Sequence, residues 1–142
     1  MDIVKICNRV YRTLGNAHNE CVYQKALVAE LWNHGAKTVE FEKNVPVFYT
    51  DTRGVQHTVG SERIDILLRY VHDDQARTCL MELKATASAI RNQVEVQQLR
   101  KYHHALQQMH IVCDDFYIIN FSQGMGKDQV DVVYFDQSNI DG

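Results

Sequence analysis

The sequence lacks the features that mark several large protein classes. It has a single proline in 142 residues, and its four cysteines form no C-x-x-C pair, which disfavours a zinc finger, a disulfide framework and a proline-rich linker. No apolar run approaches the roughly 20 residues of a membrane helix, and the N-terminus lacks a secretory signal pattern. These absences predict an intracellular protein with no membrane association.

A basic excess is also missing. The formal net charge is −3, which argues against the large basic surface that dominates non-specific nucleic-acid binding. A nuclease is still allowed, because a bound divalent ion neutralises its carboxylates and basic side chains can cluster locally. With 45% apolar and 23% charged residues, the composition is ordinary for a globular chain. We expect one domain over residues 1–142, with residues 136–142 as a frayed tail.

Hydrophobic periodicity predicts two helices followed by strands. Apolar residues recur at three- and four-residue steps over residues 3–14 and 20–34, where Gly15 ends the first helix and Asn16 or Asn19 caps the second. The later expected elements are strands over 39–49, 55–59, 63–71 and 76–85, a helix over 88–109, and strands over 116–121 and 130–135. This order predicts an α/β fold in which helices cover a mixed sheet.

Two of these strands carry charged residues among apolar ones. Asp65 lies within an aliphatic run, and Glu82 and Lys84 share one strand face because side chains alternate. The connection at residues 72–75 is typical of a hairpin, so Asp65 and Glu82 are expected to converge on antiparallel strands. Two carboxylates and a lysine suit a hydrolytic magnesium site. The alternative is an exposed, solvated acid–base pair.

Two helical residues add to this group. Glu20 shares a helix face with Tyr23 and so starts its helix on the inward side, although a first-turn glutamate also stabilises the helix dipole by roughly 0.3–1 kcal/mol. Gln98 lies in the middle of a helical stripe whose other side chains, spaced four residues apart, are apolar. A buried amide without hydrogen bonds costs about 1–3 kcal/mol, so we expect Gln98 to meet a polar feature inside the protein.

Basic residues flank Gln98 on the same helix. Arg91, Arg100 and Lys101 are candidates for contacts with phosphate groups, which would give affinity without reading sequence. The alternative is an ordinary charged surface.

The stretch LGNAHNECVY, residues 14–23, resembles the signature of the GxxExxY proteins, a family placed in the PD-(D/E)xK nuclease-like superfamily. Glu20 and Tyr23 of the naming motif are kept, whereas its first glycine is Ala17 here. The resemblance runs from roughly residue 3 to residue 135 and takes in the strands of Asp65 and Glu82 and the helix of Gln98. It implies a restriction-endonuclease-like core, with a central mixed β-sheet flanked by helices.

The resemblance also implies roles for individual residues. Asp65 and Glu82 would bind Mg²⁺ or Mn²⁺, helped by the backbone carbonyl of Leu83. Lys84 would position or activate the attacking water.

Residues outside these strands would assist. Glu20 would be an accessory acid near the metal, and Gln98 would orient water or phosphate.

Two functions are therefore carried forward. The first is a metal-dependent nuclease that hydrolyses phosphodiester bonds of DNA, with RNA as the second choice. The alternative is a non-catalytic nucleic-acid-binding or protein-interaction module on the same fold, which the acidic net charge favours. A homodimer or a protein partner is left open.

Overall fold

The computed structural model describes residues 1–90 and 92–141 of the chain. In chain order its elements are α1 (Ile3–Leu14), α2 (Glu20–Asn33), β1 (Thr38–Thr50), β2 (Gln56–His72), β3 (Gln75–Lys84), α3 (Asn92–Gln108), β4 (Asp115–Asn120) and β5 (Asp131–Asp136). The first two helices end and begin as predicted, since Gly15 is the C-cap of α1 and Asn19 the N-cap of α2. Within the described ranges, no helix combines the length and apolar character of a bilayer span.

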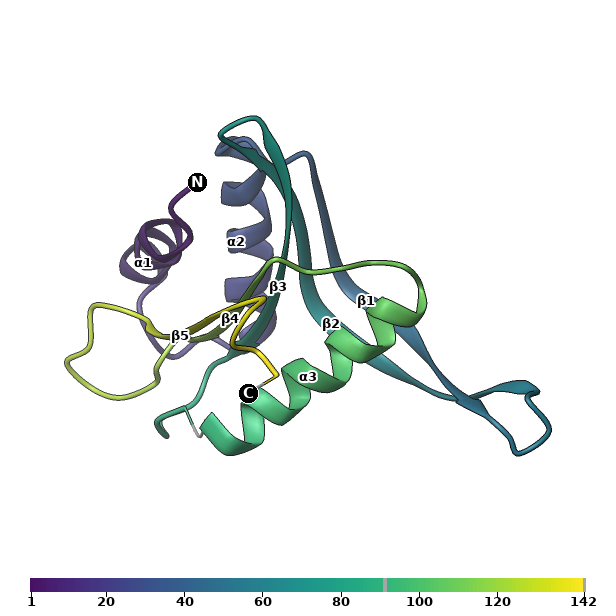
Figure 1. Cartoon of the computed structure of the whole chain (residues 1–142). Coiled ribbons are helices and arrows are strands. Elements are labelled where there is room, and N and C mark those ends of the chain that lie inside the picture. The colour runs from purple at the N-terminus through teal and green to yellow at the C-terminus, as the bar shows by residue number, and fades with distance from the viewer. Residues whose placement is uncertain (91, 142) are drawn as a thin grey trace.

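The five strands form one mixed sheet in the order β1-β2-β3-β4-β5 (Figure 1). Every neighbouring pair is antiparallel except β3 and β4, which are parallel and are connected through α3. The predicted hairpin between the two charged strands is confirmed, with Asp73 and Asp74 at positive φ in its turn. The predicted α/β class with a mixed sheet is likewise confirmed.

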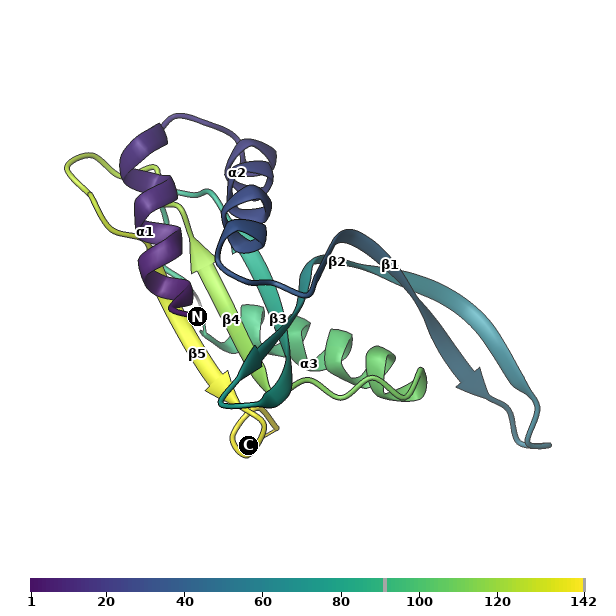
Figure 2. The same cartoon turned by 90° about the horizontal axis from the view of Figure 1, so that it is seen from above.

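Helices cover both faces of the sheet (Figure 2). The helices α1 and α2 pack on one face over a core that includes Ile66, Met81 and Leu83, while α3 packs on the other over Leu80 and Phe116. Successive residues of β3 therefore point to opposite layers. Glu82 and Lys84 lie on the α3 side, with the alternation that the sequence predicts.

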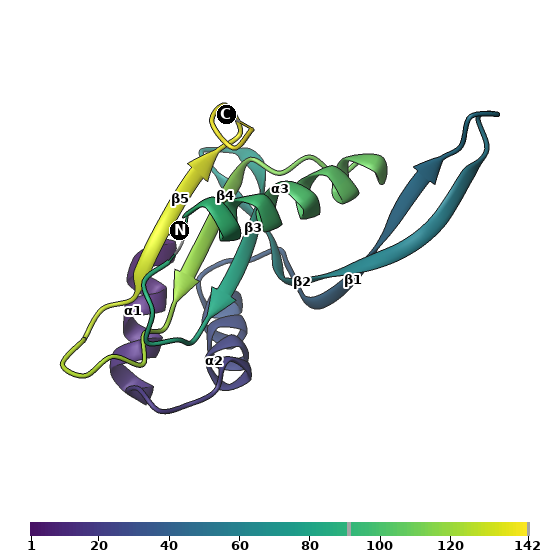
Figure 3. The ribbon, with the colours of Figure 1, turned by 90° about the horizontal axis from the view of Figure 1, so that it is seen from below.

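The β1–β2 hairpin extends well beyond the helical layers as a two-stranded arm (Figures 1 and 3). Two separate strands were expected over 55–59 and 63–71, and this was wrong, because β2 runs unbroken for 17 residues. Its first half is exposed on both faces, so no apolar alternation marks it in the sequence. The edge position expected for Pro46 agrees with the place of β1 at the sheet margin.

The buried face of α3 differs from the expected stripe. Val94 is 53% exposed, whereas Leu99, Tyr102 and Leu106 are buried. A strict four-residue repeat drifts around a helix of 3.6 residues per turn, so mixed steps of three and four are needed to stay on one side. The helix also begins at Asn92 and not at residue 88.

The C-terminal segment, where fraying is expected from residue 136, forms a turn over residues 137–141 in the structure. Asp136 accepts hydrogen bonds from the backbone of Ser138 and Asn139, which closes a turn. Ile140 is then buried against the α3 core, and its carbonyl accepts a 2.6 Å bond from Nε of Arg100. The tail therefore contacts α3 through both Ile140 and Arg100.

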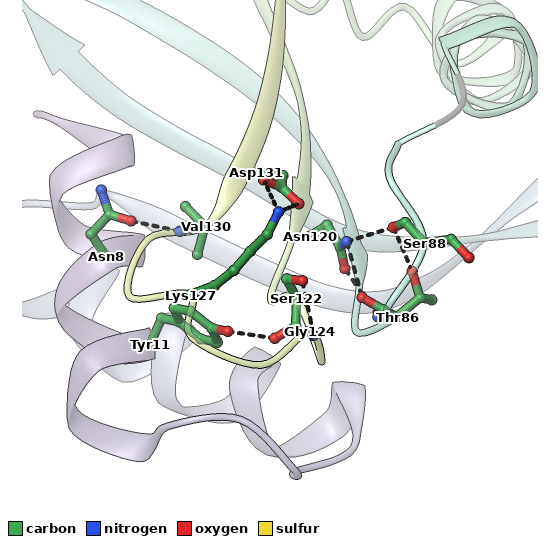
Figure 4. Close-up of polar contacts among 10 residues, drawn as sticks. All are labelled: Asn8, Tyr11, Thr86, Ser88, Asn120, Ser122, Gly124, Lys127, Val130 and Asp131. Atoms are coloured by element: carbon green, nitrogen blue, oxygen red, sulfur yellow. Dashed lines mark hydrogen bonds and ion pairs between the residues drawn. The ribbon is translucent and has the colours of Figure 1, made fainter.

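The loop after β4 is tied to α1 (Figure 4). The buried hydroxyl of Tyr11 donates to the carbonyl of Ser122, and the Asn8 side chain accepts a 2.8 Å bond from the backbone of Val130. Near its far end, Lys127 pairs with Asp131 at 3.3 Å. These bonds fix the carboxyl end of β4, which lies beside the end of β3 (Figure 3).

Candidate functional site

The site is built where the ladder between β2 and β3 stops. The last ladder pair is Ile66 opposite Met81, and Asp65 and Glu82 are the next residues along the two strands. Beyond that pair a side-chain hydrogen bond replaces the backbone ladder: Oδ2 of Asp65 accepts from the Leu83 N–H at 2.7 Å. Residues opposite one another on antiparallel strands share a face, so the two carboxylates are brought together as the sequence predicts.

Glu82 and Lys84 form a partly buried ion pair beside Asp65. The Lys84 Nζ lies 3.3 Å from Oε1 of Glu82, and Glu82 is only 5% exposed. Its second oxygen, Oε2, is buried and has no hydrogen-bond partner among the described residues. A buried carboxylate oxygen without a donor is costly, and the Asp65 carboxyl lies within hydrogen-bond reach of Glu82, so this oxygen can be satisfied by a proton shared between the two acids or by a cation.

The electrostatics of this pair point the same way. Burial, reinforced by the nearby Asp65 charge, raises the pKa of Glu82 from its usual 4.5 to about 8, against the opposing effect of Lys84. Burial also raises the pKa of Asp65, although the Leu83 N–H and Lys84 act to lower it. Lys84 and Arg63 offset this effect only in part, and a cation between the buried Glu82 and the half-buried Asp65 would favour the ionised form of both.

The helix α2 brings two further residues to this end of the sheet. Glu20 begins the helix just after the cap Asn19. Glu20 is exposed in the structure, contrary to the inward position expected from its helix face. Partial desolvation still raises its pKa, and the charge of Asp65 adds to the rise. Gln24, one turn later, is buried and donates a 2.9 Å bond to the backbone carbonyl of Asp65.

The role of Gln24 is not evident from sequence reasoning. Its position four residues after Glu20 puts both on one helix face, and that spacing is the only signal the sequence offers.

The helix α3 supplies a polar pair. Gln98 is half-buried and its amide donates a 2.6 Å bond to the hydroxyl of Tyr102. Burial raises the pKa of Tyr102, and the charge of Glu82 adds to the rise. Gln98 thus meets a polar feature, the Tyr102 hydroxyl, as the sequence predicts.

The basic residues expected beside Gln98 do not form one group. Arg100 is directed to the carbonyl of Ile140 near the C-terminus. Lys101 pairs with Glu62 on β2 at 3.2 Å and is largely exposed. Arg91 lies outside the described residues.

The residues that could hold a divalent cation are few. Among residues 1–90 and 92–141, no group of three or more histidine, cysteine, aspartate or glutamate side chains is arranged to hold a metal. Asp65 and Glu82 offer two carboxylates, and the Leu83 carbonyl belongs to the same stretch of β3. Hard oxygen donors and one buried oxygen without a partner fit Mg²⁺ or Mn²⁺, which keep several water ligands.

A mixed sheet between helices, with acids and a lysine at the end of its central hairpin, defines a restriction-endonuclease-like core. Residues 1–133 match a family model described as the PD-(D/E)XK nuclease superfamily. The chain therefore belongs to this superfamily. A comparison with curated proteins finds no match.

Proposed function

We propose that the protein is a metal-dependent nuclease that hydrolyses phosphodiester bonds of DNA, with RNA as the second choice. The observation that carries the proposal is the buried Oε2 of Glu82, which has no partner among the described residues although Asp65 and Lys84 lie beside it. The superfamily supports a nucleic-acid substrate. We also propose that the chain belongs to the GxxExxY branch, on the strength of Glu20 and Tyr23.

Each residue would have a distinct task. Asp65, Glu82 and the Leu83 carbonyl would hold Mg²⁺ or Mn²⁺, which would polarise the scissile phosphate and lower the pKa of the attacking water. The ammonium of Lys84, kept near by Glu82 at 3.3 Å, would donate to that water or to a phosphate oxygen as charge develops. The Leu83 N–H and Gln24 fix the side chain and backbone of Asp65, so its position does not depend on the ligand.

The helical residues would act from the two sides of this centre. Glu20, at the start of α2, would be an accessory acid whose charge falls within reach of Asp65. Gln98 would orient water or phosphate while its amide is held by the Tyr102 hydroxyl. Lys101 and Arg100 would contribute at most to general phosphate affinity.

Cleavage assays with a matched acid control test the proposal. Purified protein is incubated with plasmid, single-stranded DNA and RNA, with and without Mn²⁺. We expect metal-dependent cleavage that is lost in Asp65→Ala and kept in Asp128→Ala, since Asp128 is an exposed loop acid. Absence of cleavage at high protein concentration, or cleavage that survives Asp65→Ala, contradicts the assignment.

The non-catalytic module is favoured by one observation, the lack of a third metal-binding side chain in the described part of the chain. Calorimetry separates the two functions. A nuclease requires Mg²⁺ or Mn²⁺ binding that Glu82→Gln abolishes. A protein that binds no divalent ion but forms a stable complex with itself or another protein is the interaction module.

A further inference from the structure

A second buried carboxylate without a partner lies outside the residues assigned so far. Glu95, in the first turn of α3, is 8% exposed, and its Oε2 has no hydrogen-bond partner among the described residues. Glu95 forms no ion pair with the described residues. The lysine of the same pocket, Lys84, pairs with Glu82. A buried carboxylate is an acceptor only, so Glu95 needs donors that these residues do not supply.

Glu95 lines a pocket of about 310 Å³ that opens beside the candidate catalytic centre. Lys84 forms one wall, and Ala89 and Ile90 add apolar surface. This volume is at the lower end of the range for ligand sites, about 300–1,000 Å³, and suits a single ring system. The pocket therefore joins a buried acceptor, an apolar wall and the lysine proposed to meet the scissile phosphate.

The wall that follows β3 is held in place by Asn120 (Figure 4). The Asn120 Oδ1 accepts from the Thr86 N–H at 3.0 Å, and its Nδ2 donates to the carbonyls of Thr86 and Ser88 at 3.2 and 3.1 Å. The Thr86 hydroxyl also donates to the Ser88 carbonyl, at 3.1 Å. These groups shape the pocket but are already engaged, so Glu95 is its principal free acceptor.

A second divalent cation fits this donor set poorly. Among the described residues that line the pocket, Glu95 is the one carboxylate and the Asn120 oxygen is already used, so a Mg²⁺ or Mn²⁺ ion there would depend almost wholly on water ligands. An apolar wall with a carboxylate fits a planar base whose amino group donates to that carboxylate, as in contacts between glutamate and cytosine N4. A base can reach so buried a group only when it is unpaired.

We propose that the Glu95 pocket accepts an unpaired nucleobase carrying an exocyclic amino group, cytosine in preference to thymine, next to the phosphate at Lys84. This inference rests on the proposed nuclease function and deepens it. It assigns single-stranded or locally opened nucleic acid as the substrate. Glu95 becomes a specificity-determining residue.

Binding of two homopolymers tests the pocket. Fluorescence anisotropy compares oligo(dC) with oligo(dT) of equal length, with Ca²⁺ in place of Mg²⁺. We expect the full-length protein to bind oligo(dC) about tenfold more tightly, the order of discrimination of one good base contact. Glu95→Ala should lose the preference and leave oligo(dT) affinity unchanged, whereas Gln97→Ala, an exposed change on the same helix, should keep it.

A chemical variant of the ligand removes any dependence on the folding of the mutant. Oligo(dC) with N4,N4-dimethylcytosine has no amino N–H, and the wild-type protein should bind it no better than oligo(dT). Equal affinity for oligo(dC) and oligo(dT) overturns the pocket assignment but leaves nucleic-acid binding standing. Binding of neither overturns the proposed substrate class as well. A calorimetric Mn²⁺ site that disappears in Glu95→Ala, with unchanged base preference, assigns the pocket to a cation and overturns the inference.

Discussion

A buried carboxylate lies at each end of the paired strands β3 and β4, and the two differ in their hydrogen bonding. At the amino end, Asp115 is 4% exposed and accepts hydrogen bonds from Tyr70, Tyr134 and twice from Arg77. At the carboxyl end, Glu82 is as deeply buried but has one ion pair and an oxygen without a partner in the described chain. Burial is alike, and only the supply of donors differs.

The pKa values follow this difference. The donors around Asp115, chiefly Arg77, outweigh the cost of burial and hold the pKa of that carboxyl below 3.8. For Glu82 the cost of burial dominates, and the pKa rises to about 8. A satisfied acid of this kind stabilises the fold, whereas an unsatisfied one costs stability and marks a place for a ligand. In open α/β sheets, ligand sites also lie outside the carboxyl ends of the strands.

The largest expected effect is on catalysis, and a pair of isosteric changes measures it. Glu82→Gln should reduce the Mn²⁺-dependent cleavage rate by about a thousandfold, because metal ions contribute several kcal/mol of charge stabilisation to such transition states. Asp115→Asn should leave the rate per folded molecule unchanged. Initial rates on a fluorescent oligonucleotide, corrected for the folded fraction by circular dichroism, provide the measurement. Similar losses of cleavage rate in both variants would show that the two ends do not differ in function.

The second effect is on stability, and of the same two variants Asp115→Asn should now show the larger loss. Asp115→Asn leaves Arg77 without its carboxylate, and breaking a buried pair in this way costs about 3–5 kcal/mol. Glu82→Gln removes a carboxylate that lacks donors, so the metal-free protein should be as stable as the wild type or more so. Urea unfolding in EDTA measures both. A Glu82→Gln variant destabilised as strongly as Asp115→Asn would show that Glu82 is a structural residue.

The hairpin bearing Asp65 and Glu82 was predictable because its signals are local. Strand alternation and a short polar connection between residues 71 and 76 determine both the pairing and the shared face. The continuity of β2 between residues 59 and 63 was not predictable, since a strand with solvent on both sides needs no apolar pattern. Gln24 and Glu95 were also beyond reach, because only the packing of α2 and α3 on the sheet buries them.

A third test uses pH. In metal-free protein, folded Glu82 keeps a proton up to pH about 8 that the unfolded chain releases near 4.5, so stability should fall as the pH rises through this window. Asp115 acts with the opposite sign, since its stabilisation is present above 3.8 and is lost only as the pH falls below it. Melting temperatures in EDTA between pH 5 and 8.5 should therefore decline in the wild type.

The Glu82→Gln variant is the control for this decline and should flatten it. Added Mn²⁺ should raise the melting temperature more at pH 8 than at pH 5.5, because metal binding requires the deprotonated carboxylate. A wild-type profile that overlays that of Glu82→Gln would remove Glu82 as the titrating group.

The smallest effect is expected at an exposed ion pair between a lysine and a glutamate. Lys101 lies 3.2 Å from Glu62, nearly the separation of Lys84 and Glu82, but the Lys101 side chain is 63% exposed. Solvent screens such a pair, so Lys101→Met should change the free energy of unfolding by less than about 1 kcal/mol. If Lys101 contacts phosphate, the variant should lower the salt dependence of oligonucleotide binding by about one unit of slope. Urea titrations and anisotropy across a salt series measure the two quantities. A stability loss comparable to that of Asp115→Asn would mean that distance, and not burial, decides what a charge pair contributes.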